Sequence, residues 1–135
     1  EREKQNDLRD IISRSNHEKA VITLKPQDTI LQAYSKMKLY DISQIPVLEN
    51  NQVIGIIDEY DILVALEDEK TIRFKNQVKE FMSSNIETLK PDDSHDKLIS
   101  LLKKGYAAII TDEKKFYGII TKIDFITYLK RKMKD

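Results

Sequence analysis

The chain contains an internal repeat, and this repeat constrains its fold more than any other feature of the sequence. Residues 23–26, Thr-Leu-Lys-Pro, return at 88–91, an offset of 65. Residues 55–61, Gly-Ile-Ile-Asp-Glu-Tyr-Asp, return at 118–124 as Gly-Ile-Ile-Thr-Lys-Ile-Asp, an offset of 63. Two anchors in the same order indicate two copies of one supersecondary unit. The second copy is two residues shorter between the anchors, a change that a loop accommodates.

Both copies predict the order strand, helix, strand, strand, helix. A short apolar strand (20–24 and 86–89) runs into Lys-Pro, and proline disfavours helix at the residue before it. In the first copy Thr29 then caps a helix, with Gln32 completing a capping box, and in the second copy Asp93 or Ser94 is the cap. Apolar residues follow at helical spacing: Ile30, Ala33, Tyr34 and Met37 in one copy, Leu98, Leu101 and Leu102 in the other.

The second half of each copy predicts a hairpin and a closing helix. Apolar runs at 45–48 and 53–57 flank a polar turn, as do the runs at 107–111 and 116–120. The closing helices begin near Asp58 and near Thr121. In the second of them, helical spacing is kept by Ile123, Ile126, Thr127 and Lys130.

The repeats set the domain boundaries. We place repeat 1 at 8–68, a charged linker at 69–77 and repeat 2 at 78–132. The apolar residues Leu8, Ile11 and Ile12 are assigned to the first copy, and residues 78–82 open the second. A three-stranded sheet with helices on one face leaves apolar surface that another copy can cover, which explains why the units come as a pair.

Composition excludes several classes of function. The 135 residues carry 23 Lys and Arg against 23 Asp and Glu, whereas a nucleic-acid binder relies on excess cation. There is no Cys, and neither His17 nor His95 has a second ligand at helical spacing, so we expect no metal site. No apolar run approaches the ~20 residues of a membrane span. We therefore expect a cytoplasmic α/β binding module, with no nucleic-acid or membrane partner, rather than an enzyme.

Two units that each end in Gly-Ile-Ile-x-x-x-Asp resemble a pair of CBS domains, also called a Bateman module. Within that family, residues 37–48 and 55–59 resemble the first repeat of the C-terminal regulatory region of bacterial cystathionine β-synthase, and residues 107–110 and 116–125 resemble its second. The resemblance implies tandem CBS domains, two βαββα repeats packed through their sheets with pseudo-twofold symmetry. It also implies a homodimer of CBS pairs and an attached catalytic domain that uses pyridoxal phosphate, whereas the CBS pair itself is expected to hold no cofactor.

The resemblance further implies a regulatory site for an adenosine ligand, either S-adenosylmethionine or AMP, ADP or ATP. In this site Asp124 accepts hydrogen bonds from the ribose hydroxyls, and Thr121, at the start of a helix, meets a ribose or phosphate oxygen. The other ligand-binding positions are Val21, Ile22, Thr23, Ile42, Ser43, Gln44, Ile45, Pro46 and Ile123. Thr121 and Asp124 are also residue types that cap a helix, and both roles stay open.

A second, weaker site is expected from the equivalent positions Asp61, Ile86, Thr88, Tyr106 and Ala107. Here Asp58 replaces the Thr or Ser of the family pattern, and a carboxylate at that position repels phosphate. We expect Asp58 to cap its own helix instead. Tyr106 stands at the position that matches Ser43, where its ring fills the slot for the base. The sequence thus predicts one working site, built on Asp124.

Few cations accompany the proposed site. Ser43 and Gln44 stand where nucleotide-sensing CBS pairs often place Arg or His, and Lys122 is the one charge beside Thr121. This scarcity favours a ligand without phosphates, such as S-adenosylmethionine. Two functions remain open: an allosteric ligand-sensing module that controls an attached enzyme, and a ligand-free module that dimerises through its exposed helices.

Overall fold

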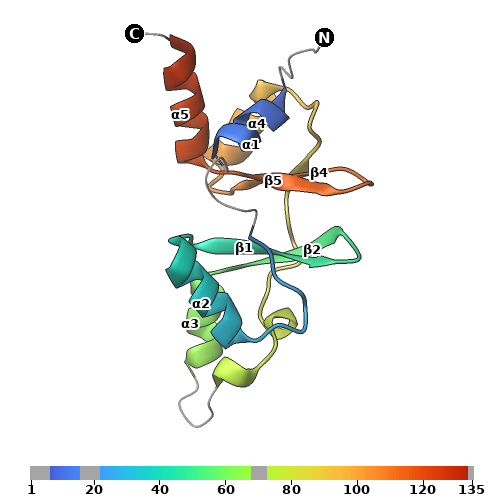
Figure 1. Cartoon of the computed structure of the whole chain (residues 1–135), viewed down its shortest axis with the longest axis vertical. Helices are drawn as coiled ribbons and strands as arrows, with labels where there is room; N and C mark the ends of the chain where they lie inside the picture. Colours follow the sequence, from blue (N-terminus) through green and yellow to red (C-terminus); the bar gives the residue numbers. More distant parts are fainter. Residues whose placement is uncertain (1–6, 16–21, 68–72, 134–135) are drawn as a thin grey trace. The chain divides into compact units, whose positions relative to one another are not determined.

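Five α-helices, two short 3₁₀ helices and five strands make up the described part of this computed structural model, which comprises residues 7–15, 22–67 and 73–133. These elements form the mixed α/β architecture that the sequence predicts (Figure 1). The contacts divide the chain into two compact units. Ile22–Ile86 form one unit, and the other combines Glu87–Asp135 with the residues before Ile22.

The unit of Ile22–Ile86 is built on an antiparallel hairpin of β1 (Gln44–Glu49) and β2 (Gln52–Asp58). The turn residues Asn50 and Asn51 have φ angles of 53° and 66°. Two successive positive φ angles make the turn type that matches strand twist, and Asn tolerates this conformation. The predicted hairpin is confirmed. The predicted first strand is not: of its described residues only Leu24 pairs, in a single parallel bridge with Val47.

Helices α2 (Ile30–Tyr40) and α3 (Glu59–Leu66) cover this hairpin and are capped as the sequence predicts. The Thr29 side chain accepts from the Gln32 amide, and the Gln32 side chain accepts from the Thr29 amide, so the capping box is confirmed. The buried side chains form one cluster of Leu24, Ile30, Ala33, Met37, Ile45, Val47, Ile57, Ile62, Ala65 and Val78.

The chain after α3 stays with this unit. The 3₁₀ helix η1 (Arg73–Lys75) contacts α2 and α3, and the ring of Phe74 lies 6.0 Å from that of Tyr34. In η2 (Val78–Glu80) the side chain of Val78 is completely buried, and Ser83 exchanges two backbone hydrogen bonds with Ile56. Residues 73–83 therefore complete the core of the first repeat, although the sequence places 78–82 at the opening of the second.

The other unit has a three-stranded sheet in the order β3 (Thr88–Leu89), β4 (Ala108–Thr111), β5 (Phe116–Ile120). The pair β3–β4 is parallel and the hairpin β4–β5 is antiparallel, as predicted, but β3 is shorter than the expected strand at 86–89. Ser94 caps α4 (His95–Lys103) by accepting from the Lys97 amide, and α5 (Lys122–Met133) closes the repeat.

Helix α1 (Leu8–Ser15), which the sequence places within repeat 1 at 8–68, packs in this unit. Leu8 and Ile11 are completely buried, and α1 contacts both α5 and β5. Its apolar residues share one cluster with the helices and strands of the second repeat: Leu8, Ile11, Ile12, Leu98, Leu101, Leu102, Ala108, Ile110, Ile120, Phe125 and Tyr128.

Candidate functional site

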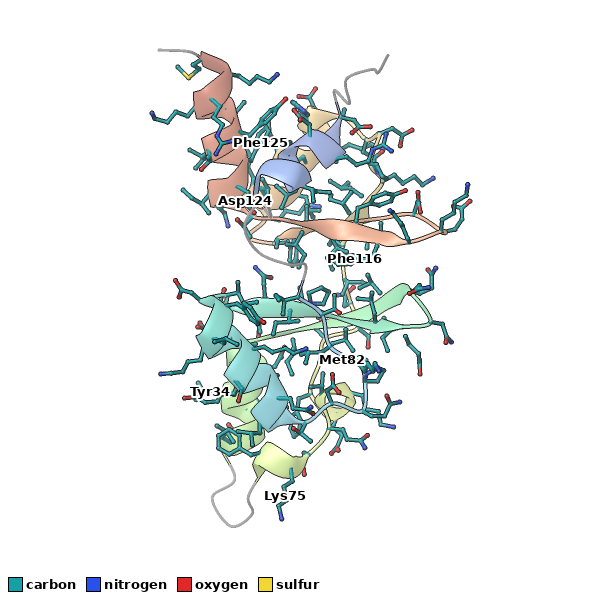
Figure 2. All side chains as sticks on the ribbon, in the orientation of Figure 1. Tyr34, Lys75, Met82, Phe116, Asp124 and Phe125 are labelled. Atoms are coloured by element: carbon teal, nitrogen blue, oxygen red, sulfur yellow. The ribbon has the colours of Figure 1, made fainter. Side chains whose placement is uncertain are left out.

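The junction of β5 and α5 carries Thr121 and Asp124, the pair at the centre of the expected site. Asp124 is labelled in Figure 2. The Thr121 amide donates to Asp124 Oδ2 over 2.9 Å, and the Asp124 amide donates to Thr121 Oγ1 over 3.4 Å. These reciprocal hydrogen bonds confirm the helix-capping role. Both side chains remain partly exposed. Among the described residues no hydrogen bond to Asp124 Oδ1 is present, so this oxygen is available as an acceptor.

The equivalent junction in the other unit pairs two carboxylates, Asp58 and Asp61. The Asp58 amide donates to Asp61 Oδ2 over 2.9 Å and the Asp61 amide to Asp58 Oδ1 over 3.0 Å, so Asp58 caps α3 as predicted. Burial raises the pKa of Asp61 to about 6, and the neighbouring Asp58 charge adds to this effect. The start of α3 therefore carries two carboxylates, whereas the start of α5 carries one, Asp124.

The predicted base-binding positions are brought together along β1. The Leu24 amide donates to the Pro46 carbonyl over 3.0 Å, and the Leu48 amide donates to the Leu24 carbonyl over 2.8 Å. This pairing places Ile22 and Thr23, just before Leu24, next to the start of β1. Ile22, Thr23, Ile42 and Gln44 are partly exposed and Ser43 is exposed, whereas Ile45 and Pro46 are buried and offer backbone groups only. Val21 lies outside the described residues.

Lys36 is a polar group of this region that the sequence analysis missed. Its Nζ atom donates to the Thr23 carbonyl over 2.9 Å, and the side chain is half-buried. The contact joins residues thirteen positions apart, from α2 to the segment before the first bridge. Helical periodicity places Lys36 at the margin of the buried face, but no spacing rule in the sequence points to its carbonyl partner.

The remaining predicted positions divide between the units. Asp61 and Ile86 belong to the unit of Ile22–Ile86, whereas Thr88, Tyr106 and Ala107 belong to the unit that also holds Thr121, Ile123 and Asp124. Ala107 is partly buried and Thr88 is exposed. Tyr106 is 48% exposed, so its own unit does not bury the ring. Ile123 is 64% exposed and lies on the outer face of α5. The side of α5 that faces the core carries Phe125 and Tyr128.

A comparison with models of protein families identifies the family of this chain. The family described as the CBS domain matches twice, over residues 8–68 and 78–131. The chain belongs to the CBS domain family. The two matches make it a CBS pair, in agreement with the repeat in the sequence and with its fold.

Known proteins similar to this CBS pair include an enzyme and ligand complexes. Inosine-5′-monophosphate dehydrogenase of Methanocaldococcus jannaschii is 34% identical over 112 residues, which are 80% of this chain and 21% of the enzyme. The CBS domain pair of protein MJ0100, solved with 5′-methylthioadenosine and S-adenosyl-L-methionine, has a TM-score of 0.74 at 23% identity, covering 94% of this chain and 98% of that one. CBSX2, solved with AMP, has a TM-score of 0.75 at 19% identity and covers 93% and 96%.

The CBS pair spans only a small part of its curated relatives, 21% of the dehydrogenase and 38% of an uncharacterised protein from the same organism. Within the ranges that the structure describes, none of the helices has the length and apolar character needed to cross a membrane.

Proposed function

We propose that this CBS pair is a cytoplasmic regulatory module that binds one adenosine ligand and thereby controls an attached enzyme, without catalysing a reaction itself. Asp124 holds the ribose hydroxyls through Oδ1, and Thr121 meets a ribose or phosphate oxygen at the start of α5. The base is contacted by the side chains or backbone of five residues: Ile22, Thr23, Ile42, Ser43 and Gln44. Ile45 and Pro46 contact it through the backbone. Val21 and Ile123 complete the set.

The observation that carries this proposal is the difference between the two equivalent helix starts. At the Thr121 junction a neutral hydroxyl caps the helix, and Asp124 keeps an acceptor that no described residue uses. At the Asp58 junction both side chains are carboxylates, and each accepts from the backbone amide of the other residue. A ribose needs a charged acceptor, and an anionic ligand needs a helix start without a second negative charge. The weaker site of Asp61, Ile86, Thr88, Tyr106 and Ala107 is therefore proposed to stay empty of nucleotides.

The ligand class is supported by the relatives. MJ0100 is described with 5′-methylthioadenosine and S-adenosyl-L-methionine, and CBSX2 with AMP. All three ligands share an adenosine group, which is the part that Asp124 and the segment before Leu24 are proposed to bind. Lys36 adds a cation beside Thr23, so phosphate-bearing ligands are candidates on the same footing as S-adenosylmethionine.

For the host we propose a pyridoxal-phosphate enzyme that resembles cystathionine β-synthase, on the strength of residues 37–48 and 116–125. A second host class, an inosine-5′-monophosphate dehydrogenase, is supported by the 34% identity to the archaeal enzyme. The coding sequence on either side of this chain distinguishes the two, because only the first host carries a lysine that binds pyridoxal phosphate.

The function is tested by calorimetric titration with S-adenosylmethionine, AMP, ADP and ATP. We expect one site per chain, and we expect Asp124→Asn to weaken binding ten- to a hundredfold because it removes the charge that accepts from the ribose. The matched variant Asp61→Asn should change affinity less than twofold. Two equal sites, or a larger effect of Asp61→Asn, would contradict the assignment; no binding by the unaltered chain would leave the assembly function described next.

A specific observation favours a second function, assembly through exposed helices. Tyr60 and Leu63 on α3 are 70% and 67% exposed, and their equivalents 63 residues later, Ile123 and Ile126 on α5, are 64% and 57% exposed. Equal apolar exposure at matching positions is typical of an interface that uses both repeats. Sedimentation of the Ile126→Asp variant tests this: we expect a dimer for the unaltered chain and a monomer for the variant.

A further inference from the structure

Helix α1 is the first element of the segment matched as the first repeat, but it packs beside the junction that carries Thr121 and Asp124. Leu8 and Ile11 are completely buried and Ile12 is 7% exposed, all in the cluster that contains Ile120 and Phe125. These two residues flank the Thr121–Asp124 junction, one at the end of β5 and one in the first turn of α5. Helix α1 thus contacts both elements that form the junction, β5 and α5 (Figure 1).

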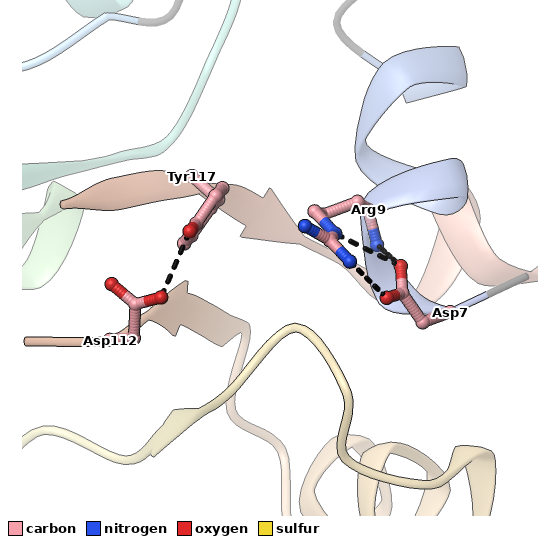
Figure 3. A network of polar contacts seen from close by, with 4 residues as sticks. All are labelled: Asp7, Arg9, Asp112 and Tyr117. Atoms are coloured by element: carbon pink, nitrogen blue, oxygen red, sulfur yellow. Dashed lines mark hydrogen bonds and ion pairs between the residues drawn. The ribbon is translucent and has the colours of Figure 1, made fainter. Parts of the chain in front are cut away.

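The start of α1 is tied down by polar contacts. The Leu8 amide donates to the Pro91 carbonyl over 3.0 Å. Asp7 caps the helix by accepting from the Arg9 amide over 2.9 Å, and the Arg9 guanidinium donates to the same carboxylate over 2.7 Å (Figure 3). The hydrogen bonds from Arg9 hold the pKa of Asp7 below its usual value. The cap is therefore charged at neutral pH and sets the first residue of the helix.

An eight-residue helix is not stable on its own in water, so α1 is helical only while it is docked. Undocking of α1 would therefore also unfold it. In the undocked state Leu8, Ile11 and Ile12 leave a gap behind β5 and α5, and the Thr121–Asp124 junction loses the packing that orients it.

We propose that α1 is a positioning helix for the adenosine site and links occupation of that site to the chain before Leu8. This inference rests on the proposed function of Thr121 and Asp124. A ligand held at the junction favours the docked state, and by thermodynamic reciprocity any attached domain that pulls α1 away lowers ligand affinity by the same factor. Much larger polypeptides do carry such pairs, since the match covers only 21% of the archaeal dehydrogenase.

Two leucine truncations in the same core separate this role from general loss of stability. Leu8 on α1 and Leu98 on α4 are both completely buried in the same cluster. Helix α1 contacts both β5 and α5, whereas α4 contacts β4 and reaches α5 through the ring of His95, 5.5 Å from that of Phe125. In calorimetric titrations with AMP and with S-adenosylmethionine, we expect Leu8→Ala to weaken binding about five- to tenfold, a coupling of ordinary size. Leu98→Ala, measured well below its own melting temperature, should weaken binding less than twofold.

Hydrogen exchange of the α1 amides supplies the reciprocal measurement. Saturating AMP or S-adenosylmethionine should slow amide exchange in α1 of the unaltered chain. The expected slowing is about five- to tenfold, the factor by which Leu8→Ala is expected to weaken binding. If Leu8→Ala does not fold, Ile12→Val takes its place, with a two- to threefold loss of affinity expected. Binding by the unaltered chain with no change in α1 exchange, or equal losses in the Leu8 and Leu98 variants, would overturn this inference alone. Absence of binding by the unaltered chain would overturn the proposed function and this inference together.

Discussion

At the residue scale, the same position in the two repeats carries different chemistry. The capping residue is Thr121 in one repeat and Asp58 in the other, while the third residue after it is an aspartate in both. The hydrogen-bond pattern is the same, since each pair exchanges two bonds between side chain and backbone. Charge is what differs: one junction pairs a neutral hydroxyl with a carboxylate, and the other pairs two carboxylates, of which Asp61 holds its proton more tightly.

The Asp61 carboxyl predicts an unusual dependence of stability on pH. Burial raises the pKa of Asp61 from 3.8 to about 6, so between those values the folded chain binds more protons than the unfolded chain. The contribution of Asp61 to the free energy of unfolding therefore falls as pH rises from about 4 to about 6. We expect Asp61→Asn to gain stability relative to the unaltered chain over this window, as measured by urea denaturation at a series of pH values.

Other carboxylates act in the opposite direction. Hydrogen bonds lower the pKa values of Asp7, Asp93 and Asp112, so the stability that they contribute is present at neutral pH and is lost on acidification. The free energy of unfolding is therefore compared at each pH between Asp61→Asn and the unaltered chain. The contributions of these three carboxylates are the same in both and cancel in the difference. A difference that stays constant from pH 4 to pH 7 would contradict the assignment.

At the scale of elements, the caps and hairpins follow from local sequence. Thr29, Asp58 and Ser94 each satisfy backbone amides within their own first turn, and Asn50 and Asn51 make their turn without distant partners. Such features can be predicted from the sequence because the interacting residues are three or fewer positions apart. By contrast, the sequence could not predict how much of 20–24 and 86–89 forms a strand. The pairing of an edge segment depends on the neighbouring strand, which is distant in the sequence.

Gly55 marks a contact of this non-local kind. A Cβ atom at this position would lie 2.6 Å from Met82 Sδ and 2.9 Å from the Ser83 carbonyl oxygen, at the place where residues 82–83 cross β2. Met82 can move, but the Ser83 backbone is held by its two hydrogen bonds with Ile56. We expect Gly55→Ala to cost about 1–3 kcal/mol of unfolding free energy, as is usual for overpacking. Urea denaturation of the variant beside the unaltered chain measures this cost.

Gly105→Ala is a useful control for this measurement. Gly105 has a φ of 97°, but a Cβ atom added there would meet no atom within 4 Å, so its cost comes from backbone strain and not from contact. Trimming Met82 to Ala should relieve only part of the Gly55→Ala penalty, whereas it should leave the Gly105→Ala penalty unchanged. Equal relief of both would show that crowding at residues 82–83 is not the cause.

At the scale of the whole molecule, chain order and packing order differ. Helix α1, the first element of repeat 1, packs with the elements of repeat 2, and Val78, before the strands of repeat 2, packs with the elements of repeat 1. The spacing of Leu8, Ile11 and Ile12 predicts an apolar face but contains no information on which core receives it. The repeat, the helices and the family could thus be predicted, whereas this exchange and the Lys36 contact could not.

The exchange predicts where a core mutation is felt. Val78 is completely buried among Ile30, Ile45 and Ile57. We expect Val78→Ala to cost about 2 kcal/mol for the two lost methyl groups and the cavity. Hydrogen exchange should accelerate in β1, β2 and α2, by more than in β4 and β5. Faster exchange in β4 and β5 first would contradict the assignment of Val78 to the core of the first repeat.

The position of α1 has a consequence for how such a protein can be divided. Cleavage anywhere between residues 68 and 72 yields an N-terminal half that keeps α1 but not the core that buries it, and a C-terminal half that keeps Val78 but not the core that buries that residue. Each half would expose apolar side chains that the other half shelters. A single repeat expressed alone would therefore have an incomplete core. The smallest part of this molecule with complete cores is the pair of repeats.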